Sequence, residues 1–279
     1  MALTSIYGTI DSNGDLVQGN AGVGTVIGTA EASVTVGSIS DGITRNTAIG
    51  GTQNSAGFRI DCGVLAFDAA FTWITRLVHR DAAAGTDYGT IASRGAVFQN
   101  DSQVAYGIRG NAGGAEQTFY VYQRNGSTLI GTEELHAGDI TAGTIYTFGV
   151  RCQNGNQEMR LYNAAGTLIR QEVTNATADA PTDGSQHVFL LGPADFTNAA
   201  DVSTNKEILA FLVYDDYKDN TAMDAIAADV YGQIPVAGGS GVSGDRGVER
   251  GFFRGSRRGM GLTMVKHNGI WRPSRRLQA

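Results

Sequence analysis

Phe71-Thr72-Trp73-Ile74-Thr75-Arg76-Leu77-Val78 is the clearest strand signal in this sequence. Large apolar residues alternate in it with polar ones, which is typical of a half-buried β-strand. Comparable runs recur down the chain, separated by turn clusters such as those at 154–156 and 164–166. They are Val104 to Arg109, Thr118 to Gln123, Ile145 to Cys152, Glu158 to Tyr162, Thr167 to Val173, His187 to Leu191 and Ile208 to Tyr214. Many short strands at this spacing predict an all-β sandwich.

The segments on either side of these strands differ from them in composition. Residues 1–57 are poor in charge and rich in Gly, Ser, Thr, Ala and Val, which predicts an N-terminal β arm or small lobe. Thr221 to Tyr231 has a helical apolar face after Asp219, a residue able to cap it. A Gly/Ser-rich linker then precedes the tail. We therefore predict an arm at 1–57, a sandwich at 58–234, a linker at 235–244 and a tail at 245–279.

Size and composition restrict the class of protein. A chain of 279 residues can bury a full core without disulfides, and 39 Gly against 4 Pro indicate many tight turns. Cys62 and Cys152 have no metal-like spacing, so we expect them in the core, with a single bridge left open. The four histidines likewise show no paired metal spacing. No apolar run is long enough to span a membrane and Met1 to Thr9 lacks signal-peptide features, so we expect no membrane insertion and a chain assembled in a host cytoplasm.

Several segments occur in an order that resembles the concanavalin A-like jelly-roll superfamily, in particular its laminin-G-like and pentraxin-like branch. The resemblance covers residues 58 to 231 and includes the short helix that ends the domain. It rests on 71–74 with the buried Trp73, 88–95, 106–109, 146–150, 159–166 and 211–214. It implies a jelly-roll sandwich.

The resemblance also implies loops at one rim that bind glycans or proteins, often with calcium. The rim candidates for a ligand or a calcium ion are Asp81, Asp87, Asn111, Asn154 and Asn156, which could equally be turn formers. No other cofactor is expected, and no metal site is assigned.

A hydrolase branch of that superfamily uses clustered acids on one strand. Here the nearest acid pairs are Glu133-Glu134 and Asp215-Asp216, and neighbours in a strand point to opposite faces. We therefore expect no enzyme and assign no catalytic residue. A glycoside hydrolase is the least favoured alternative.

Charge is divided sharply along the chain. From Asp245 onward there are nine Lys/Arg and two Asp/Glu, a net charge of +7. The total of −6 therefore leaves −13 for residues 1–244, the body of the chain. A basic, glycine-spaced end beside an acidic body predicts a segment that docks onto something else. Arg/Gly segments with Phe252 and Phe253 could also bind nucleic acid, but the acidic body makes this the less favoured reading.

The end of the chain, Met264 to Pro273, resembles a short β-hairpin element of tailed-phage structural proteins with a Val-Lys-x-x-Gly-x-Trp stretch. Asn268-Gly269 would form its type I′ turn, and Trp271 would be a large apolar anchor. Arginines supply forked donors for carboxylates or phosphates. The predicted docking residues are Arg250, Arg254, Arg257, Arg258, Trp271, Arg272, Arg275 and Arg276.

Together these features predict a virion structural protein, either a capsid decoration or spike or a tail-fibre component, that displays a lectin-like jelly roll. Its expected partners are other virion proteins and sister subunits in a homo-oligomer. The first alternative is a glycan-binding module that recognises a receptor on the host surface. The position on the virion and the identity of any glycan stay open.

Overall fold

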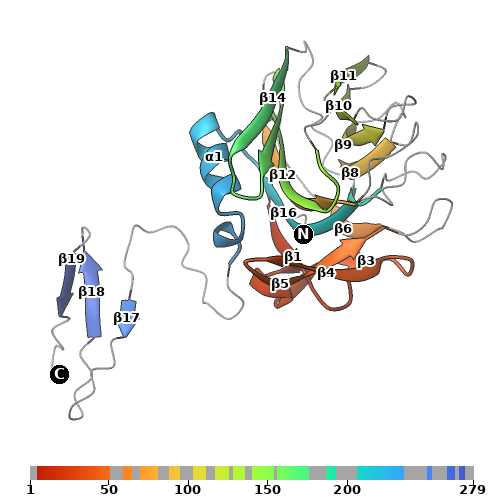
Figure 1. Ribbon diagram of the computed structural model, residues 1–279. Coiled ribbons are helices and arrows are strands. Elements are labelled where there is room, and N and C mark those ends of the chain that lie inside the picture. Colours follow the sequence, from red (N-terminus) through yellow and green to blue (C-terminus); the bar gives the residue numbers. More distant parts are fainter. Residues whose placement is uncertain are drawn as a thin grey trace. The chain divides into compact units, whose positions relative to one another are not determined.

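The computed structural model (Figure 1) describes residues 5–50, 59–64, 70–80, 88–94, 103–110, 117–125, 128–135, 140–153, 156–175, 187–192, 206–235, 250–252, 263–267 and 270–273. The chain divides into two compact units, Met1–Gly238 and Gly239–Ala279. The first unit is called the body here and the second the C-terminal unit.

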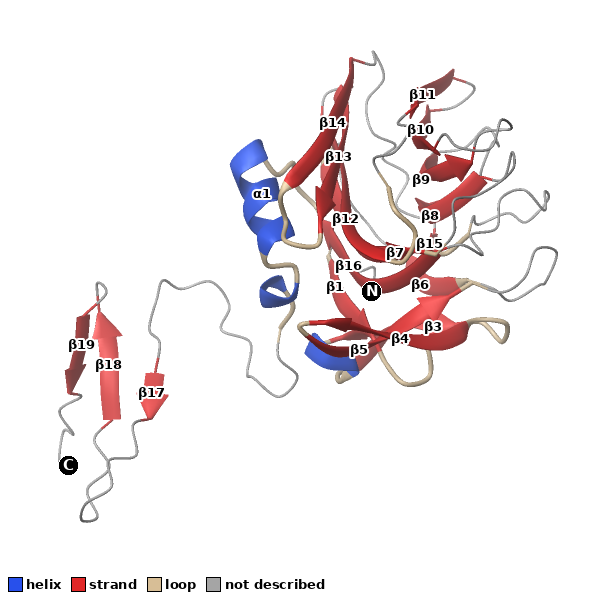
Figure 2. Ribbon diagram, in the orientation of Figure 1, coloured by secondary structure: helices blue, strands red, loops and turns tan. Residues whose placement is uncertain are grey.

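The body is built from β-strands with one α-helix at its end (Figure 2). Its elements are β1 (Ile6–Ile10), β2 (Leu16–Gln18), η1 (Asn20–Gly22), β3 (Thr25–Ala30), β4 (Thr35–Asp41), β5 (Ile43–Ile49), β6 (Ile60–Val64), β7 (Phe71–His79), β8 (Tyr88–Arg94), β9 (Gln103–Gly110), β10 (Gln117–Asn125), β11 (Thr128–Leu135), β12 (Thr144–Gln153), β13 (Asn156–Asn163), β14 (Leu168–Asn175), β15 (His187–Leu190), β16 (Lys206–Tyr214), α1 (Asn220–Ala228) and η3 (Tyr231–Gln233). The expected strands are confirmed; β6, β11 and most of the N-terminal strands had no specific prediction.

The body strands form one folded-over antiparallel sheet. Its order is β11-β10-β9-β8-β15-β6-β3-β2-β1-β16-β7-β12-β13-β14, with the β4–β5 hairpin joined through β16. Strand β3 pairs with β2 on one side and with β6 on the other, so it passes from one layer to the other. We call the part from β2 to β14 the first layer and the part from β6 to β11 the second layer. Figure 2 shows β12–β14 and β8–β11 facing each other as two layers. This is the expected jelly-roll sandwich.

The main core lies between the two layers. Trp73 is fully buried there, with its ring centroid 5.8 Å from that of Phe71 and 5.9 Å from that of Phe211. Cys62 of β6 and Cys152 of β12 belong to the same cluster and are not joined by a disulfide. Both cysteines therefore fill core positions, as expected, and the possible bridge is absent.

Strand β7 departs from its expected half-burial, because both of its faces are buried along the whole strand. Ile74, on the face away from the main core, packs with Met223 and Ile226 of α1. Val78 belongs to a separate apolar cluster, and Ile39 of β4 packs against that cluster. The outer face is covered by α1 and by the β4–β5 hairpin, elements far from β7 in sequence.

Helix α1 follows its sequence signals closely. The Asp219 carboxylate accepts a hydrogen bond from the Ala222 amide at 2.8 Å, which caps the helix N-terminus. Met223, Ile226 and Ala227 form the buried face. The expected continuation to Tyr231 is instead a turn that leads into η3.

The first 57 residues, expected as an arm or small lobe, lie within the body. Strand β1 pairs antiparallel with β16, Ile6 opposite Val213, and with β2 on its other edge. Ile6 and Ile10 are buried in the main core. The described part of this segment is thus built into the sandwich, because its apolar strand completes the first layer.

The C-terminal unit holds a three-stranded antiparallel sheet in the order β17 (Arg250–Phe252), β18 (Thr263–His267) and β19 (Ile270–Pro273). Strands β18 and β19 form the expected hairpin, with His267 opposite Ile270. The two residues between them, Asn268 and Gly269, lie outside the described residues. A two-residue connection fits the tight hairpin turns that Asn-Gly favours.

Candidate functional site

The docking residues predicted from the tail are only partly placed by the structure. Arg250 lies in β17, and Trp271 and Arg272 lie in β19. The remaining five lie outside the described residues; they are Arg254, Arg257, Arg258, Arg275 and Arg276.

The strand register of the C-terminal unit brings two of the predicted arginines into one row. Arg250 and Arg272 are both opposite Val265, on either side of β18. Directly opposite residues of an antiparallel pair share a face of the sheet, so Arg250 and Arg272 are placed on one face. Trp271 is opposite Lys266, in the neighbouring row, which belongs to the other face. The register therefore places Arg250 and Arg272 in one row of the sheet and Trp271 in the neighbouring row.

The rim residues proposed for a ligand or for calcium are mostly outside the described part of the chain. Asp81, Asp87, Asn111 and Asn154 fall there, and Asn156 is the first residue of β13. Within the described ranges, no group of three or more His, Cys, Asp or Glu side chains could hold a metal ion. Calcium binding at the rim stays a prediction.

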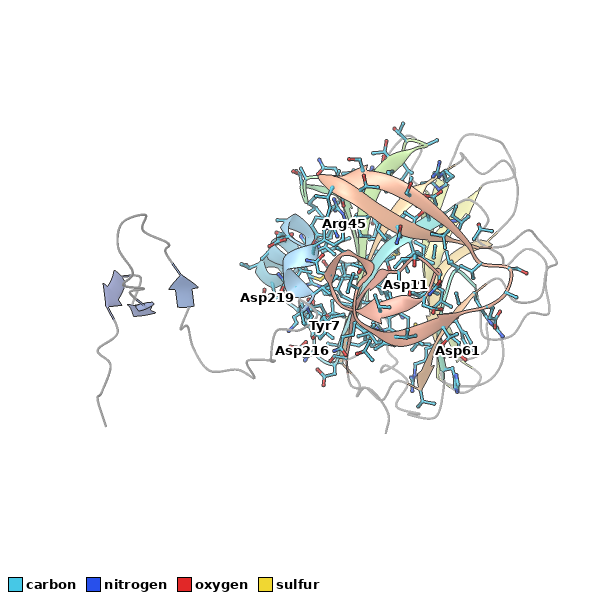
Figure 3. The ribbon with its side chains drawn as sticks, turned by 90° about the horizontal axis from the view of Figure 1, so that it is seen from below. Tyr7, Asp11, Arg45, Asp61, Asp216 and Asp219 are labelled. Atoms are coloured by element: carbon cyan, nitrogen blue, oxygen red, sulfur yellow. The ribbon has the colours of Figure 1, made fainter. Side chains whose placement is uncertain are left out.

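The two acid pairs lie in different parts of the body, Glu133 and Glu134 in β11 and Asp215 and Asp216 directly after β16. Glu133 and Glu134 are neighbours in β11, opposite Tyr120 and Phe119 of β10. The Asp216 carboxylate instead accepts a hydrogen bond from Lys218 Nζ at 2.8 Å. Figure 3 shows the carboxylates of Asp11, Asp61 and Asp216 at separate places on this side of the body.

A surface cluster that the sequence analysis missed lies where β6 meets β15. His187 Nδ1 is 2.9 Å from Asp61 Oδ1, and the imidazole stacks on the Phe189 ring at 5.9 Å. The Arg59 guanidinium lies over the same ring at 4.3 Å and pairs with Glu31 at 3.0 Å. His187 and Asp61 are both exposed, so we call these five residues the β6–β15 surface cluster. It offers a cation on an aromatic ring beside carboxylates, groups that can bind polar ligands.

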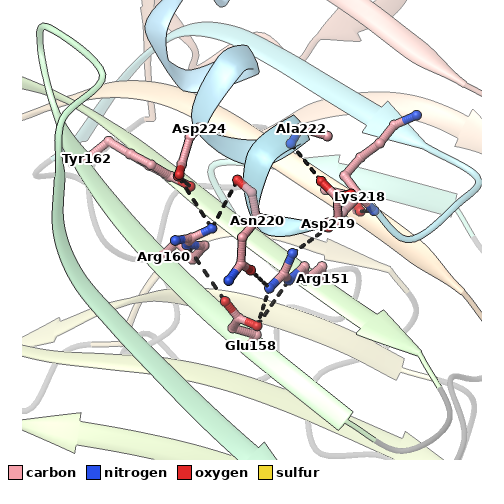
Figure 4. A network of polar contacts seen from close by, with 10 residues as sticks. Arg151, Glu158, Arg160, Tyr162, Lys218, Asp219, Asn220, Ala222 and Asp224 are labelled. Carbon is pink, nitrogen blue, oxygen red and sulfur yellow. Dashed lines mark hydrogen bonds and ion pairs between the residues drawn. The ribbon is translucent and has the colours of Figure 1, made fainter.

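A second group of charged side chains is buried beneath the start of α1 (Figure 4). Arg151 donates to Glu158 and Asn220, with Nε 3.1 Å from Glu158 Oε2. Arg160 Nη1 is 3.4 Å from Asp224 Oδ1. These contacts join β12 and β13 to the first two turns of α1. The group therefore fixes the helix on the sheet, and we call it the helix-anchoring network.

A similar arrangement ties the N-terminal hairpin to the end of the body. Arg76 holds the Asp41 carboxylate through two hydrogen bonds of 2.6 and 2.9 Å, and the Tyr231 hydroxyl donates to Asp41 at 2.7 Å. Burial acts to raise the pKa of Asp41, but the hydrogen bonds from Arg76 and Tyr231 and the arginine charges outweigh it, so the pKa is lowered. Asp41 thus stays ionised and structural.

Comparisons with known proteins address the fold. No protein-family model matches the chain, and no curated protein matches it by sequence. The enzymatically active domain of bacteriophage CBA120 tailspike protein 2 is similar in structure, with a TM-score of 0.57 and 13% identity over 85% of this chain and 32% of that one. Full-length tailspike protein 2 from the Escherichia coli O157:H7 bacteriophage matches with a TM-score of 0.55 and 13% identity, over 85% of this chain and 28% of that one.

The botulinum neurotoxin serotype D binding domain is a third similar structure, with a TM-score of 0.51 and 11% identity over 80% of this chain and 50% of that one. This chain thus spans under a third of the length of either tailspike structure and half of the toxin domain. Among the described residues no helix has the length and apolar character needed to cross a membrane. At these identities the similarity establishes the fold: the chain is an all-β, lectin-like jelly-roll sandwich.

Proposed function

We propose that this chain is a non-enzymatic structural protein of a virion, either a capsid decoration or spike or a tail-fibre component. In this proposal the acidic body is displayed outward and the basic C-terminal unit attaches it to the particle. The observation that carries the proposal is the separate C-terminal sheet, in which Arg250 and Arg272 share one row. The similarity of the body to two phage tailspike structures supports it.

The charge distribution explains why the C-terminal unit is the part assigned to attachment. A net charge of +7 from residue 245 onward favours contact with an acidic surface, whereas −13 on the body opposes it. Forked arginine donors suit carboxylates of a partner protein. Nucleic acid would meet the same arginines but would be repelled by the body, so a protein partner is favoured.

The test is co-sedimentation of the protein with particles that lack it, across a salt series. The full chain should bind, and a chain truncated after Gly244 should not. Replacing Arg250 and Arg272 with Gln should weaken binding and reduce its salt dependence. The matched control replaces Arg59 and Lys218 of the body with Gln, which removes the same charge and should leave binding unchanged.

Binding that persists after truncation would overturn attachment through the C-terminal unit. The search would then move to the N-terminal segment, which exposes large apolar side chains. These are Val23, Val26, Val36 and Ile43. If only Trp271→Ala abolished binding, an apolar anchor would replace the electrostatic one.

The β6–β15 surface cluster supports a second candidate function, recognition of a glycan on the host surface. Arg59 over Phe189 and the exposed His187–Asp61 pair supply donors and acceptors for sugar hydroxyl groups. Glycan-array binding by the full chain that is lost in Asp61→Ala would support this function. Equal binding by wild type and variant, or no binding to any glycan, would contradict it.

A further inference from the structure

Strand β14 ends the first layer of the sandwich and has one open edge. It pairs with β13 at Leu168 and again from Arg170 to Asn175, and no strand in the described part of the chain pairs with its other edge. The open edge of a strand presents backbone donors and acceptors that can pair with another chain. Figure 1 shows β14 at the margin of the body.

The side chains of β14 are unusually exposed for large apolar residues. Leu168 is 38% exposed, Ile169 37% and Val173 54%, whereas β12 and β16 are buried almost throughout. An apolar edge strand of eight residues attracts association unless charges or bends block it. A shift in register next to Leu168 bends the start of β14, but from Arg170 onward the strand continues opposite β13 without a break.

The sequence of β14 is complementary to itself. If a second β14 lies antiparallel with the two Gln171 residues opposite each other, Arg170 of each copy falls opposite Glu172 of the other copy. Opposite charges directly across an antiparallel pair are stabilising. A two-fold symmetric interface requires such self-complementarity.

We propose that β14 is an interface between two copies of this chain, in which the first layers join edge to edge around Gln171. The occupant is a second copy, because the one positive and one negative side chain of this strand match each other and leave the strand neutral. A neutral strand matters here, since the body carries −13 and two bodies repel each other elsewhere. This interface is independent of attachment through the C-terminal unit.

Charge reversals in the full chain test the proposed register. Arg170→Glu should weaken dimerisation at least about tenfold, because glutamates would then face each other at two symmetric positions. Glu172→Arg should do the same with arginines. The double variant should restore a dissociation constant within about threefold of wild type, because opposite charges again face each other. Sedimentation velocity over a concentration series measures each constant.

Arg170 and Glu172 also interact within the chain, so thermal melts must show that each variant folds. A second measurement avoids these residues. Gln171→Cys should cross-link two full-length chains under mild oxidation, since opposite residues on paired strands lie within disulfide reach. Thr174→Cys is the matched control and should not cross-link, while Cys62 and Cys152 are buried.

The proposal is overturned if the wild-type chain is monomeric up to about 100 μM, a concentration at which even weak specific association is populated. It is also overturned if the chain oligomerises but neither single reversal weakens association and the cysteine at position 171 does not cross-link. Restoration by the double reversal, together with selective cross-linking at 171, would establish the interface and its register. Neither result depends on whether the chain binds a virion.

Discussion

His79 should make the body less stable as the pH falls from 7 to 5. It is the last residue of β7, fully buried, and lies opposite Lys206 of β16 and Thr144 of β12. Burial first, and then the charge of Lys206, lowers its pKa from 6.5 to about 4. At a pH between these two pKa values, His79 binds a proton in the unfolded chain but not in the folded one. The free energy of unfolding therefore falls as the pH falls.

The size of the effect follows from the two pKa values. One pKa unit corresponds to about 1.4 kcal/mol, so the full shift is worth about 3 kcal/mol, of which about 2 kcal/mol is lost between pH 7 and pH 5. Urea unfolding of wild type and His79→Gln at pH 5, 6 and 7 measures it. The variant lacks the titrating group, so its free energy of unfolding should fall by about 2 kcal/mol less over this range.

The control is His187→Gln, which removes an exposed histidine of the β6–β15 surface cluster. The free energy of unfolding of His187→Gln should fall between pH 7 and pH 5 by as much as that of wild type, because His79 is still present. Equal loss from pH 7 to pH 5 in wild type and His79→Gln would refute the reasoning. The imidazole would then take up its proton as readily in the folded state as in the unfolded one.

Two further predictions concern the way α1 is held on the sheet. Glu158→Gln should lower the free energy of unfolding in urea by about 3 to 5 kcal/mol, because it leaves buried arginines without their carboxylate. The control is Asp224→Asn, at a side chain that is 53% exposed, which should lower it by less than about 1 kcal/mol. Similar losses in both variants would contradict a buried network. Gly166→Ala should lower the melting temperature far more than Gly143→Ala. Both glycines have positive φ, but a Cβ at 166 would lie 2.4 Å from Ala228 Cα, whereas a Cβ at 143 meets nothing within 4 Å. Equal shifts in melting temperature would mean that the turn at Gly166 does not touch α1.

Much of the fold could be predicted from local sequence. The alternating run from Phe71 marks β7, and Asp219 with the apolar spacing after it marks α1, because strand period and helix capping are local properties. The full burial of β7 could not be predicted in this way. It depends on α1 and the β4–β5 hairpin, which reach β7 only through tertiary packing.

The candidate surfaces were harder to predict from the sequence, because they too depend on contacts between strands that are distant in sequence. The hairpin from β18 to β19 has a local signal in Asn268-Gly269, and its arginines were evident from composition. Their shared row opposite Val265 depends on the register of β17, which no local pattern specifies. The β6–β15 surface cluster joins Asp61 to His187 across two strands distant in sequence. Arg59 and Asp61 stand at alternate positions of the sequence, which would place them on the same face of a strand, and this spacing was the local signal for the cluster.

The pairing of β1 with β16 has a consequence for synthesis of the chain. Ile6 leaves the ribosome about 200 residues before its partner Val213, a delay of about 10 to 40 s at ordinary elongation rates. Until then the second strand beside β1 is missing from the middle of the first layer. The nascent body must therefore keep Ile6 and Ile10 from associating with other apolar chains. Folding is completed after translation of β16, and conditions that slow elongation should increase aggregation more than they would for a protein whose neighbouring strands are consecutive.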